Sequence, residues 1–414
     1  MFTDLNKLSK IYVYKCEFII VYICGLSNYS MTVALLNQFH KTFKEPSLFH
    51  RYIALKHIAP VLKKHEDYFD VKIIGQSVLG QPIHVITLGR GKRKVFMWSQ
   101  MHGNESTTTK AIFDLCNLFA ESDHVNIQKI LNSCTVAVIP MLNPDGAEVY
   151  TRLNANDVDL NRDAQELSQP ESLVLRAFFD DFKPDFCFNL HGQRTIFSAG
   201  NRNLPATVSF LAPAQDETCM VTDNRKKAME ILTVMNANLQ QQIPGQVGVY
   251  DDAFNMNCVG DTFQSKNIPT VLFEAGHYTN DYAREETRCY MFQSILTALH
   301  YIATTEITGD KYKAYFDIPQ NKKLFYDIII RNASLDGKVS DIGILYKEQL
   351  IKDEVEFIPT VEKIANLNGF YGHKEFDANK NNVSHKELKP IIEGDEIDLV
   401  LIKNQKIALN LQNI

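Results

Sequence analysis

Hydrophobic and polar positions follow two different periods along this chain. Apolar residues recur at helical spacing over residues 32–66, in two short amphipathic segments broken near Pro46. From there to about residue 304, short continuous apolar runs alternate with longer segments of helical spacing. The pattern predicts strands at 69–74, 83–88, 94–101, 135–140, 185–190 and 269–274, and helices at 105–120, 170–182, 225–241 and 281–304.

This alternation predicts the fold class and the domain organisation. Strands separated by helices of this length are typical of an α/β fold, in which a mixed, mostly parallel twisted sheet carries helices on both faces. We expect this α/β domain to cover residues 31–307, and a small β-rich C-terminal domain to cover residues 308–414. The β-like runs of the second part lie at 324–330, 342–346, 355–358 and 397–402, with turns at Asn332, Asp336–Gly337 and Glu393–Gly394.

Residues 1–30 stand outside this pattern. Lysines followed by a short apolar stretch at 18–25 have the outline of a secretory signal. Glu17 interrupts that order, however, and no small-x-small cleavage site follows. We expect residues 1–30 to be a leader or a misassigned start, with a secretory signal as the alternative.

Composition excludes several classes of protein. With 45% hydrophobic and 22% charged residues, the 414-residue chain fits a globular protein rather than a disordered one. A formal net charge of -6 gives no electrostatic reason to expect a nucleic-acid partner. No apolar run reaches the ~18–20 residues of a membrane-spanning helix. The eight cysteines form no CxxC pair, which favours a reducing compartment, so we expect a cytoplasmic protein.

The first candidate site residues follow the predicted strand at 94–101. His102 and Glu105 are three residues apart across a strand-to-helix turn, so their side chains can converge on one point. Imidazole nitrogens and carboxylates are good ligands for Zn²⁺. A structural histidine next to a glutamate that stabilises a helix start is the alternative interpretation of this pair alone.

Two further strand ends strengthen the metal interpretation. His191 follows the strand at 185–190, and sites in open α/β sheets form beyond the carboxyl ends of the strands. A catalytic zinc needs three protein ligands and one open position for water, and His191 supplies the third. Glu274 ends another apolar strand, where a carboxylate is costly unless it is paired or functional. Over a zinc-bound water, Glu274 can accept a proton and pass it to a leaving amine.

The segment between these strands carries arginines. The turn NPDG at 143–146 is explained by its proline and glycine alone, but Arg152 and the pair Asn161–Arg162 follow it closely. A guanidinium offers a planar fork of donors that suits a carboxylate. A solvated loop that carries both arginines is the alternative.

Together these motifs resemble the zinc metallocarboxypeptidases, the family of pancreatic-type and bacterial carboxypeptidases. They occur in family order and cover roughly residues 70–304. The matching elements are HGNE at 102–105, NPDG at 143–146, Arg152, VDLNR at 158–162, FNLH at 188–191 and TVLFE at 270–274.

The resemblance implies a role for each of these residues. It implies one zinc ion held by His102, Glu105 and His191, with Glu274 as general base and acid. The remaining implied roles are oxyanion stabilisation by Arg152, binding of the substrate's terminal carboxylate by Asn161 and Arg162, orientation of His102 by Asp159, and a phenolic cap at Tyr250.

The sequence also departs from the family pattern. Asp163 and Ala164 follow VDLNR where the family has an asparagine and an aromatic residue, and Gly192 follows His191 where many digestive relatives have serine. Three aspartates near the expected cap would give the pocket for the substrate's C-terminal side chain a preference for basic residues. The alternative is that these loop aspartates are simply solvated, as loop aspartates usually are. These aspartates are Asp251, Asp252 and Asp261.

The function expected from these features is that of a zinc-dependent hydrolase. It would remove a C-terminal amino acid from a peptide, and its substrate would carry a free carboxylate. The alternative is an N-acyl amino acid deacylase of the aspartoacylase and succinylglutamate desuccinylase type, acting on acyl-amino acids. An inactive binding module ranks third, because the expected ligands, base and arginines are all present.

Overall fold

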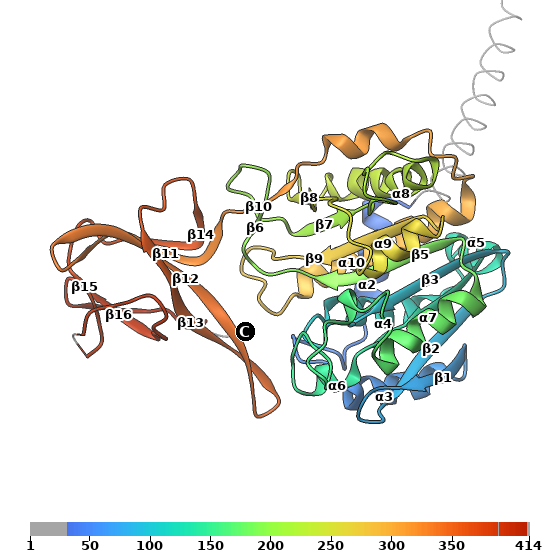
Figure 1. Ribbon diagram of the computed structural model, residues 1–414, viewed down its shortest axis with the longest axis horizontal. Helices are drawn as coiled ribbons and strands as arrows, with labels where there is room; N and C mark the ends of the chain where they lie inside the picture. The colour runs from blue at the N-terminus through green and yellow to red at the C-terminus, as the bar shows by residue number, and fades with distance from the viewer. Residues whose placement is uncertain (1–30, 388, 412–414) are drawn as a thin grey trace, which may run out of the picture.

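An eight-stranded mixed sheet forms the centre of the protein (Figure 1). The structure is a computed structural model that describes residues 31–387 and 389–411. The expectations for residues 1–30 lie outside the described residues. The strand order is β1 (Asp70–Gln76), β2 (Pro82–Gly89), β4 (Cys134–Ile139), β3 (Arg93–Ser99), β5 (Phe186–Gly192), β9 (Thr270–Ala275), β7 (Val208–Leu211) and β8 (Val247–Val249).

The central strands β4, β3, β5 and β9 run parallel to one another, while β1, β2 and β7 add antiparallel pairs. Alternate residues of β3 enter two separate cores: Val95 and Met97 on one face, Phe96 and Trp98 on the other. Because both faces are buried, such a strand appears in the sequence as a continuous apolar run. The predicted α/β class is therefore confirmed.

Helices cover both faces of this sheet. One face carries α2 (Val33–Phe43), α3 (Leu55–His65), α4 (Thr107–Glu121), α5 (Val125–Ser133), α8 (Asp223–Leu239) and α10 (Glu285–Thr304). The other face carries α7 (Pro170–Phe182) and α9 (Val259–Ser265), whose Phe179 and Phe263 rings stack at 3.8 Å. Pro170 begins α7 because the first helical turn needs no amide donor. In the described part of the chain, no helix has both the length and the apolar character needed to cross a bilayer.

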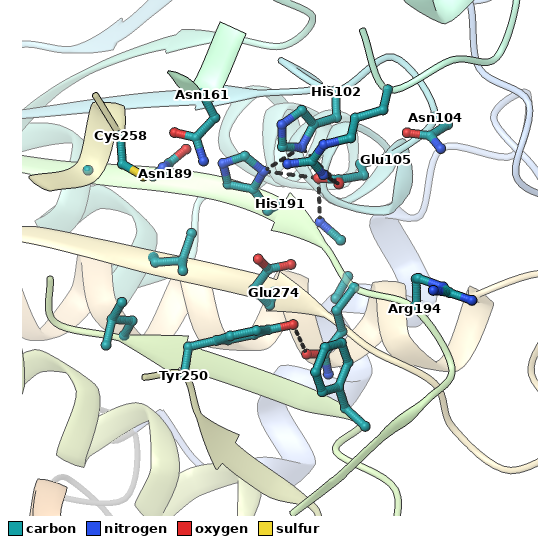
Figure 2. A pocket seen from close by; sticks show the side chains of 18 of the residues that line it. His102, Asn104, Glu105, Asn161, Asn189, His191, Arg194, Tyr250, Cys258 and Glu274 are labelled. Atoms are coloured by element: carbon teal, nitrogen blue, oxygen red, sulfur yellow. Dashed lines mark hydrogen bonds and ion pairs between the residues drawn. The ribbon is translucent and has the colours of Figure 1, made fainter. Parts of the chain in front are cut away.

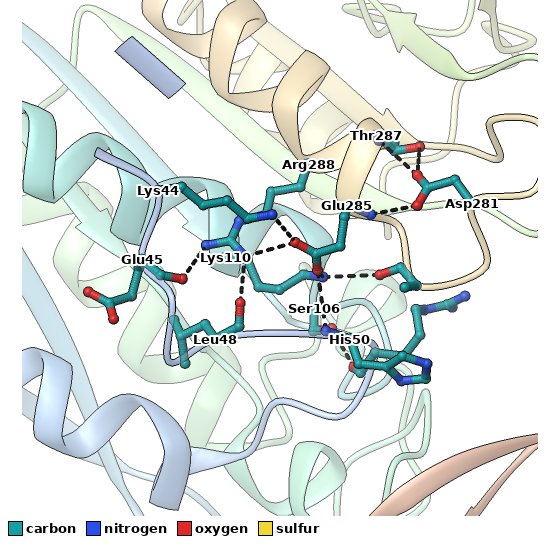
Figure 3. Close-up of polar contacts among 12 residues, drawn as sticks. Lys44, Glu45, Leu48, His50, Ser106, Lys110, Asp281, Glu285, Thr287 and Arg288 are labelled. Atoms are coloured by element: carbon teal, nitrogen blue, oxygen red, sulfur yellow. Dashed lines mark hydrogen bonds and ion pairs between the residues drawn. The ribbon is translucent and has the colours of Figure 1, made fainter. Parts of the chain in front are cut away.

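A network of buried charges attaches the segment after α2 to helices α4 and α10 (Figure 3). Glu285 forms ion pairs with Lys44, Lys110 and Arg288. Burial alone would favour the neutral acid, but Lys110 and Arg288 lower the pKa of Glu285 to about 2. The adjoining stretch then runs beneath the turn after β3, where the carbonyl of Ile53 accepts a 2.7 Å bond from Gln100 Nε2. This network therefore supports the turn that carries the first candidate ligands.

The C-terminal part consists of two small sheets (Figure 1). The larger has the order β13 (Glu354–Ala365), β12 (Lys338–Ile351), β11 (Phe325–Leu335) and β14 (Tyr371–Asp377). The smaller contains β15 (Val383–His385), β16 (Leu399–Ile402) and β17 (Gln405–Ala408). The short strand β10 (Asn321–Lys323) leads into this part and pairs with β6 (Phe197–Ala199) of the α/β part.

One predicted turn in this region is wrong. Asp336 and Gly337 both have positive φ and form the expected tight turn between β11 and β12. Asn332 instead lies within β11, where its φ of 52° accompanies a register shift between Ile330 and Ala333. Asparagine tolerates the left-handed conformation, so it produces a β-bulge here and the strand continues.

Candidate metal centre

The turn between β3 and α4 brings His102 and Glu105 together. His102 Nδ1 lies 2.8 Å from Glu105 Oε1, and the imidazole is almost fully buried. Although burial opposes charge on both groups, their mutual attraction raises the pKa of His102 and keeps that of Glu105 well below its usual range. The expected convergence across the strand-to-helix turn is present.

His191 reaches the same point from the end of the adjacent parallel strand β5 (Figure 2). Its Nδ1 atom is 3.1 Å from His102 Nδ1 and 3.0 Å from Glu105 Oε2. One potential ligand atom from each of His102, Glu105 and His191 lies within 4.8 Å of the other two. These atoms belong to residues that are far apart in sequence, and their convergence results from the pairing of β3 with β5.

The donor set fits a zinc ion. Two imidazole nitrogens and a carboxylate are the ligand types of catalytic zinc sites. His102 Nε2 lies 3.0 Å from Asp159 Oδ1, so this nitrogen can donate its proton to Asp159 and leave Nδ1 to bind a metal at the shared point. Burial lowers the pKa of His191, which favours the neutral form that a metal requires.

Glu274 lies beside this set on strand β9 (Figure 2). Its Oε2 atom is buried and has no hydrogen-bond partner among the described residues. Burial, reinforced by the charge of Glu105, raises the pKa of Glu274 well above its ordinary value. A carboxyl group that is buried, unpaired and next to potential metal ligands is suited to accept and donate a proton.

Arg152 is held against the metal-ligand set by two carboxylates. Its Nη2 atom is 3.0 Å from Asp159 Oδ2, and its Nη1 atom is 3.3 Å from Glu105 Oε1. The side chain is still 45% exposed and lines the cleft, so the guanidinium has one side fixed and another available. Asp159 therefore contacts both His102 and Arg152.

Asn161 and Arg162 lie on the short 3-10 helix η1 (Leu160–Arg162), and both line the same cleft. Asp159 caps this helix by accepting a 2.9 Å bond from the amide of Asn161. Asn161 Oδ1 accepts a bond from the amide of Val259 at the start of α9, which fixes the orientation of its side chain. The loop that follows NPDG thus brings both predicted carboxylate-binding residues into the cleft.

Tyr250 also lines the cleft, and its hydroxyl donates a 2.7 Å bond to Gln193 Oε1 (Figure 2). The same Gln193 oxygen accepts a bond from Asn321 Nδ2 on β10. Burial and the nearby Glu274 raise the pKa of the phenol, so it stays protonated. Sequence reasoning missed Gln193 and Asn321, because strand pairing and not a local motif brings them to Tyr250.

Only two of the three candidate aspartates line the cleft. Asp251 and Asp261 line the cleft, whose volume is about 710 Å³. Asp252 is instead ion-paired with Arg225, a buried residue of α8, and does not line the cleft. Burial raises the pKa of Asp261 to about 6. Lining residues to which the sequence analysis gave no role include Arg51, Asn104, Asn189, Arg194, Arg284, Tyr346, Lys347 and Glu348.

Comparison with known proteins identifies the family. The family model described as zinc carboxypeptidase matches residues 55–306. This chain belongs to the zinc carboxypeptidase family. Zinc is accordingly the metal that His102, Glu105 and His191 fit in this family member.

Individual relatives match this chain over shorter segments. Carboxypeptidase SOL1 of Arabidopsis thaliana is 29% identical over 141 residues, 30% of this chain and 29% of that protein. Gamma-D-glutamyl-L-diamino acid endopeptidase 1 of Lysinibacillus sphaericus is 35% identical over 83 residues, 18% of this chain and 21% of that protein. The matches thus span less than a third of the length of these two relatives. A metallo-carboxypeptidase structure from Burkholderia cenocepacia has a TM-score of 0.48 at 18% identity, covering 59% of this chain and 69% of that one.

Proposed function

We propose that this protein is a zinc-dependent carboxypeptidase that hydrolyses the last peptide bond of its substrate and releases the C-terminal amino acid. The proposal rests on one observation above the others. The Glu274 carboxyl, whose Oε2 atom is buried and has no hydrogen-bond partner among the described residues, adjoins the convergent His102, Glu105 and His191 set. Family membership supports the same chemistry.

Glu274 is the proton carrier in this mechanism. Zinc held by the ligand set would act as a Lewis acid towards the scissile carbonyl and would acidify water. Glu274 takes a proton from the attacking water at its free Oε2 atom and transfers it to the nitrogen of the departing amino acid. Its raised pKa matches this double role, because the same group must both accept the proton and give it up.

The arginines act on the substrate's negative charges. Arg152, fixed by Asp159, stabilises the charge that develops on the scissile carbonyl oxygen. Asn161 and Arg162 bind the terminal carboxylate, which places the last peptide bond, and no inner bond, beside Glu274. Tyr250 closes over the leaving residue with its protonated hydroxyl.

Hydrolysis assays on the purified full-length protein test this function. The panel contains N-blocked tripeptides ending in Lys, Phe or Glu, together with N-acetyl amino acids. We expect release of free C-terminal amino acids from peptides and at least tenfold lower kcat/KM for N-acetyl amino acids. Hydrolysis of the acetylated amino acids alone would support the deacylase alternative. No hydrolysis of any substrate by zinc-loaded protein would favour the binding module.

A further inference from the structure

The C-terminal β part contributes directly to the substrate cleft. Three consecutive residues in the middle of β12, Tyr346, Lys347 and Glu348, line the same cavity as the metal ligands. Figure 1 shows the long β12–β13 hairpin beside the catalytic unit, close to α6 (Pro144–Glu148). The cleft is therefore built from both parts of the chain, and its size depends on where this hairpin sits.

A buried ion pair fixes the hairpin at this position. Glu348 Oε2 accepts a 2.9 Å bond from Arg51 Nη2 and a second bond from the hydroxyl of Tyr150. Arg51 is only 8% exposed. Breaking this pair would leave a buried guanidinium without its carboxylate, which is strongly unfavourable.

Apolar packing adds to this attachment. Val355 and Phe357 on β13 are buried against Tyr52, Tyr150 and Tyr282 of the catalytic unit. In addition, the Tyr282 hydroxyl donates a 2.9 Å bond to Asp327, a buried residue of β11. Moving the hairpin away would expose these aromatic rings, so the hairpin is a fixed wall and not a freely moving flap.

The wall adjoins the turn after β3 that carries Asn104 and Glu105. In Figure 2, Asn161 lies on one side of His191, and Asn104 and Arg194 lie on the other. The hairpin contact lies next to the turn that carries Asn104, because the carbonyl of Arg51 accepts a bond from Ser106 of the same turn and Arg51 is ion-paired with Glu348. A substrate whose terminal carboxylate is bound by Asn161 and Arg162 must extend its amino-terminal part in this direction.

We propose that the β12–β13 hairpin closes the amino-terminal side of the cleft and restricts the enzyme to short peptides. This inference rests on the proposed carboxypeptidase function. A volume of about 710 Å³ lies within the range of roughly 300–1,000 Å³ that is typical of pockets for single small ligands. A long peptide would have to displace a wall held by Glu348, Val355 and Phe357.

A substrate-length series tests this inference on the full-length zinc-loaded protein. N-acetylated peptides of three, five and eight residues share the same last three residues. We expect kcat/KM to fall at least tenfold from the shortest to the longest peptide. Equal kcat/KM values for all three lengths would overturn the inference while leaving the carboxypeptidase function intact. Failure to hydrolyse any of them would instead reject the proposed function.

Hairpin variants provide the second arm of the test. Glu348→Ala removes the carboxylate partner of Arg51, and Phe357→Ser independently weakens the apolar contact. In each folded variant we expect the ratio of kcat/KM between the shortest and the longest peptide to shrink at least fivefold. In Phe357→Ser, whose side chain lies outside the cleft, kcat/KM for the tripeptide should also stay within about threefold of wild type. Lys363→Ala is the matched control on β13, because its ion pair with Glu393 is exposed. A folded hairpin variant that retains full length discrimination would contradict the inference.

Discussion

Glu274 and His191 are register partners on the adjacent parallel strands β9 and β5. Phe273 and Leu190, one residue earlier on each strand, point into the core on the opposite face. Glu274 and His191 therefore leave the sheet on the same side, at neighbouring strand ends. The sheet itself places the candidate base next to a candidate metal ligand, with no loop needed to position either.

This relationship predicts the effect of neutralising the base. Glu274→Gln keeps the shape of the side chain but removes its ability to accept a proton. We expect kcat to fall by about 10²- to 10⁴-fold with little change in KM, because general base catalysis contributes on that order. Steady-state kinetics on an N-blocked tripeptide measures kcat and KM of the variant. The control is Glu306→Gln, the same substitution at an exposed glutamate. A variant with more than half of wild-type kcat would exclude Glu274 from proton transfer.

Metal dependence is the second prediction. A chelator should abolish peptide hydrolysis, and added Zn²⁺ should restore it, because the three ligand atoms converge on one point. His191→Ala removes one of these ligands and should reduce bound zinc from about one ion per chain to a small fraction of that. Metal analysis of purified protein provides a measurement that does not depend on activity. Activity that survives complete metal removal would contradict the proposed mechanism.

Asp261 predicts a pH-dependent side-chain preference. It lines the cleft, and burial raises its pKa to about 6, so it is neutral at pH 5 and charged at pH 8. The ratio of kcat/KM for C-terminal Lys over Phe should therefore rise as pH increases through about 6. Asp261→Asn should remove this rise and lower the ratio at pH 8 about tenfold, as expected for a lost charged hydrogen bond. Asp251→Asn separates the contribution of the other lining aspartate, and an unchanged ratio in both variants would show that neither sets the preference.

Local signals predict the elements of the catalytic part well. Helix α7 begins at Pro170 and ends at Phe182 as expected, because proline favours the first turn and Lys183 takes the left-handed conformation just after it. The convergence of His102, Glu105 and His191 was also predictable, since both histidines come at the ends of apolar strands and Glu105 follows His102 by three residues. Strands β7 and β8 were missed because they contain only four and three residues, too few for a clear period.

The composition of the cleft was less predictable, because it depends on contacts between distant residues. Arg51 and Glu348 are 297 positions apart, and nothing near either residue indicates that they pair. Gln193 reaches Tyr250 in the same way, through the arrangement of strands and not through a motif. A sequence pattern therefore identified the candidate metal ligands, whereas docking of the C-terminal sheets brings further residues into the same cleft.

The final prediction concerns stability and the buried charges around Glu285. The ordinary pKa of this carboxyl is 4.5, and Lys110 and Arg288 lower it to about 2 in the folded protein. A lowered folded-state pKa means that the ionised group stabilises the fold above about pH 4.5, and that this stabilisation is lost as pH falls from 4.5 towards 2. By linkage, the shift is worth about 3 kcal/mol at neutral pH.

Glu285→Gln should therefore lower the free energy of unfolding at pH 7 by about 3 kcal/mol, because it leaves Lys110 and Arg288 buried without this carboxylate. Below pH 2 the variant and the wild type should converge, since the wild-type carboxyl is then also neutral. Urea unfolding at pH 7 and at lower pH measures both effects. Glu66→Gln, which breaks an exposed pair with Lys63, should leave the free energy of unfolding nearly unchanged. If the two variants are equally stable at pH 7, the charges around Glu285 do not hold the segment after α2 in place.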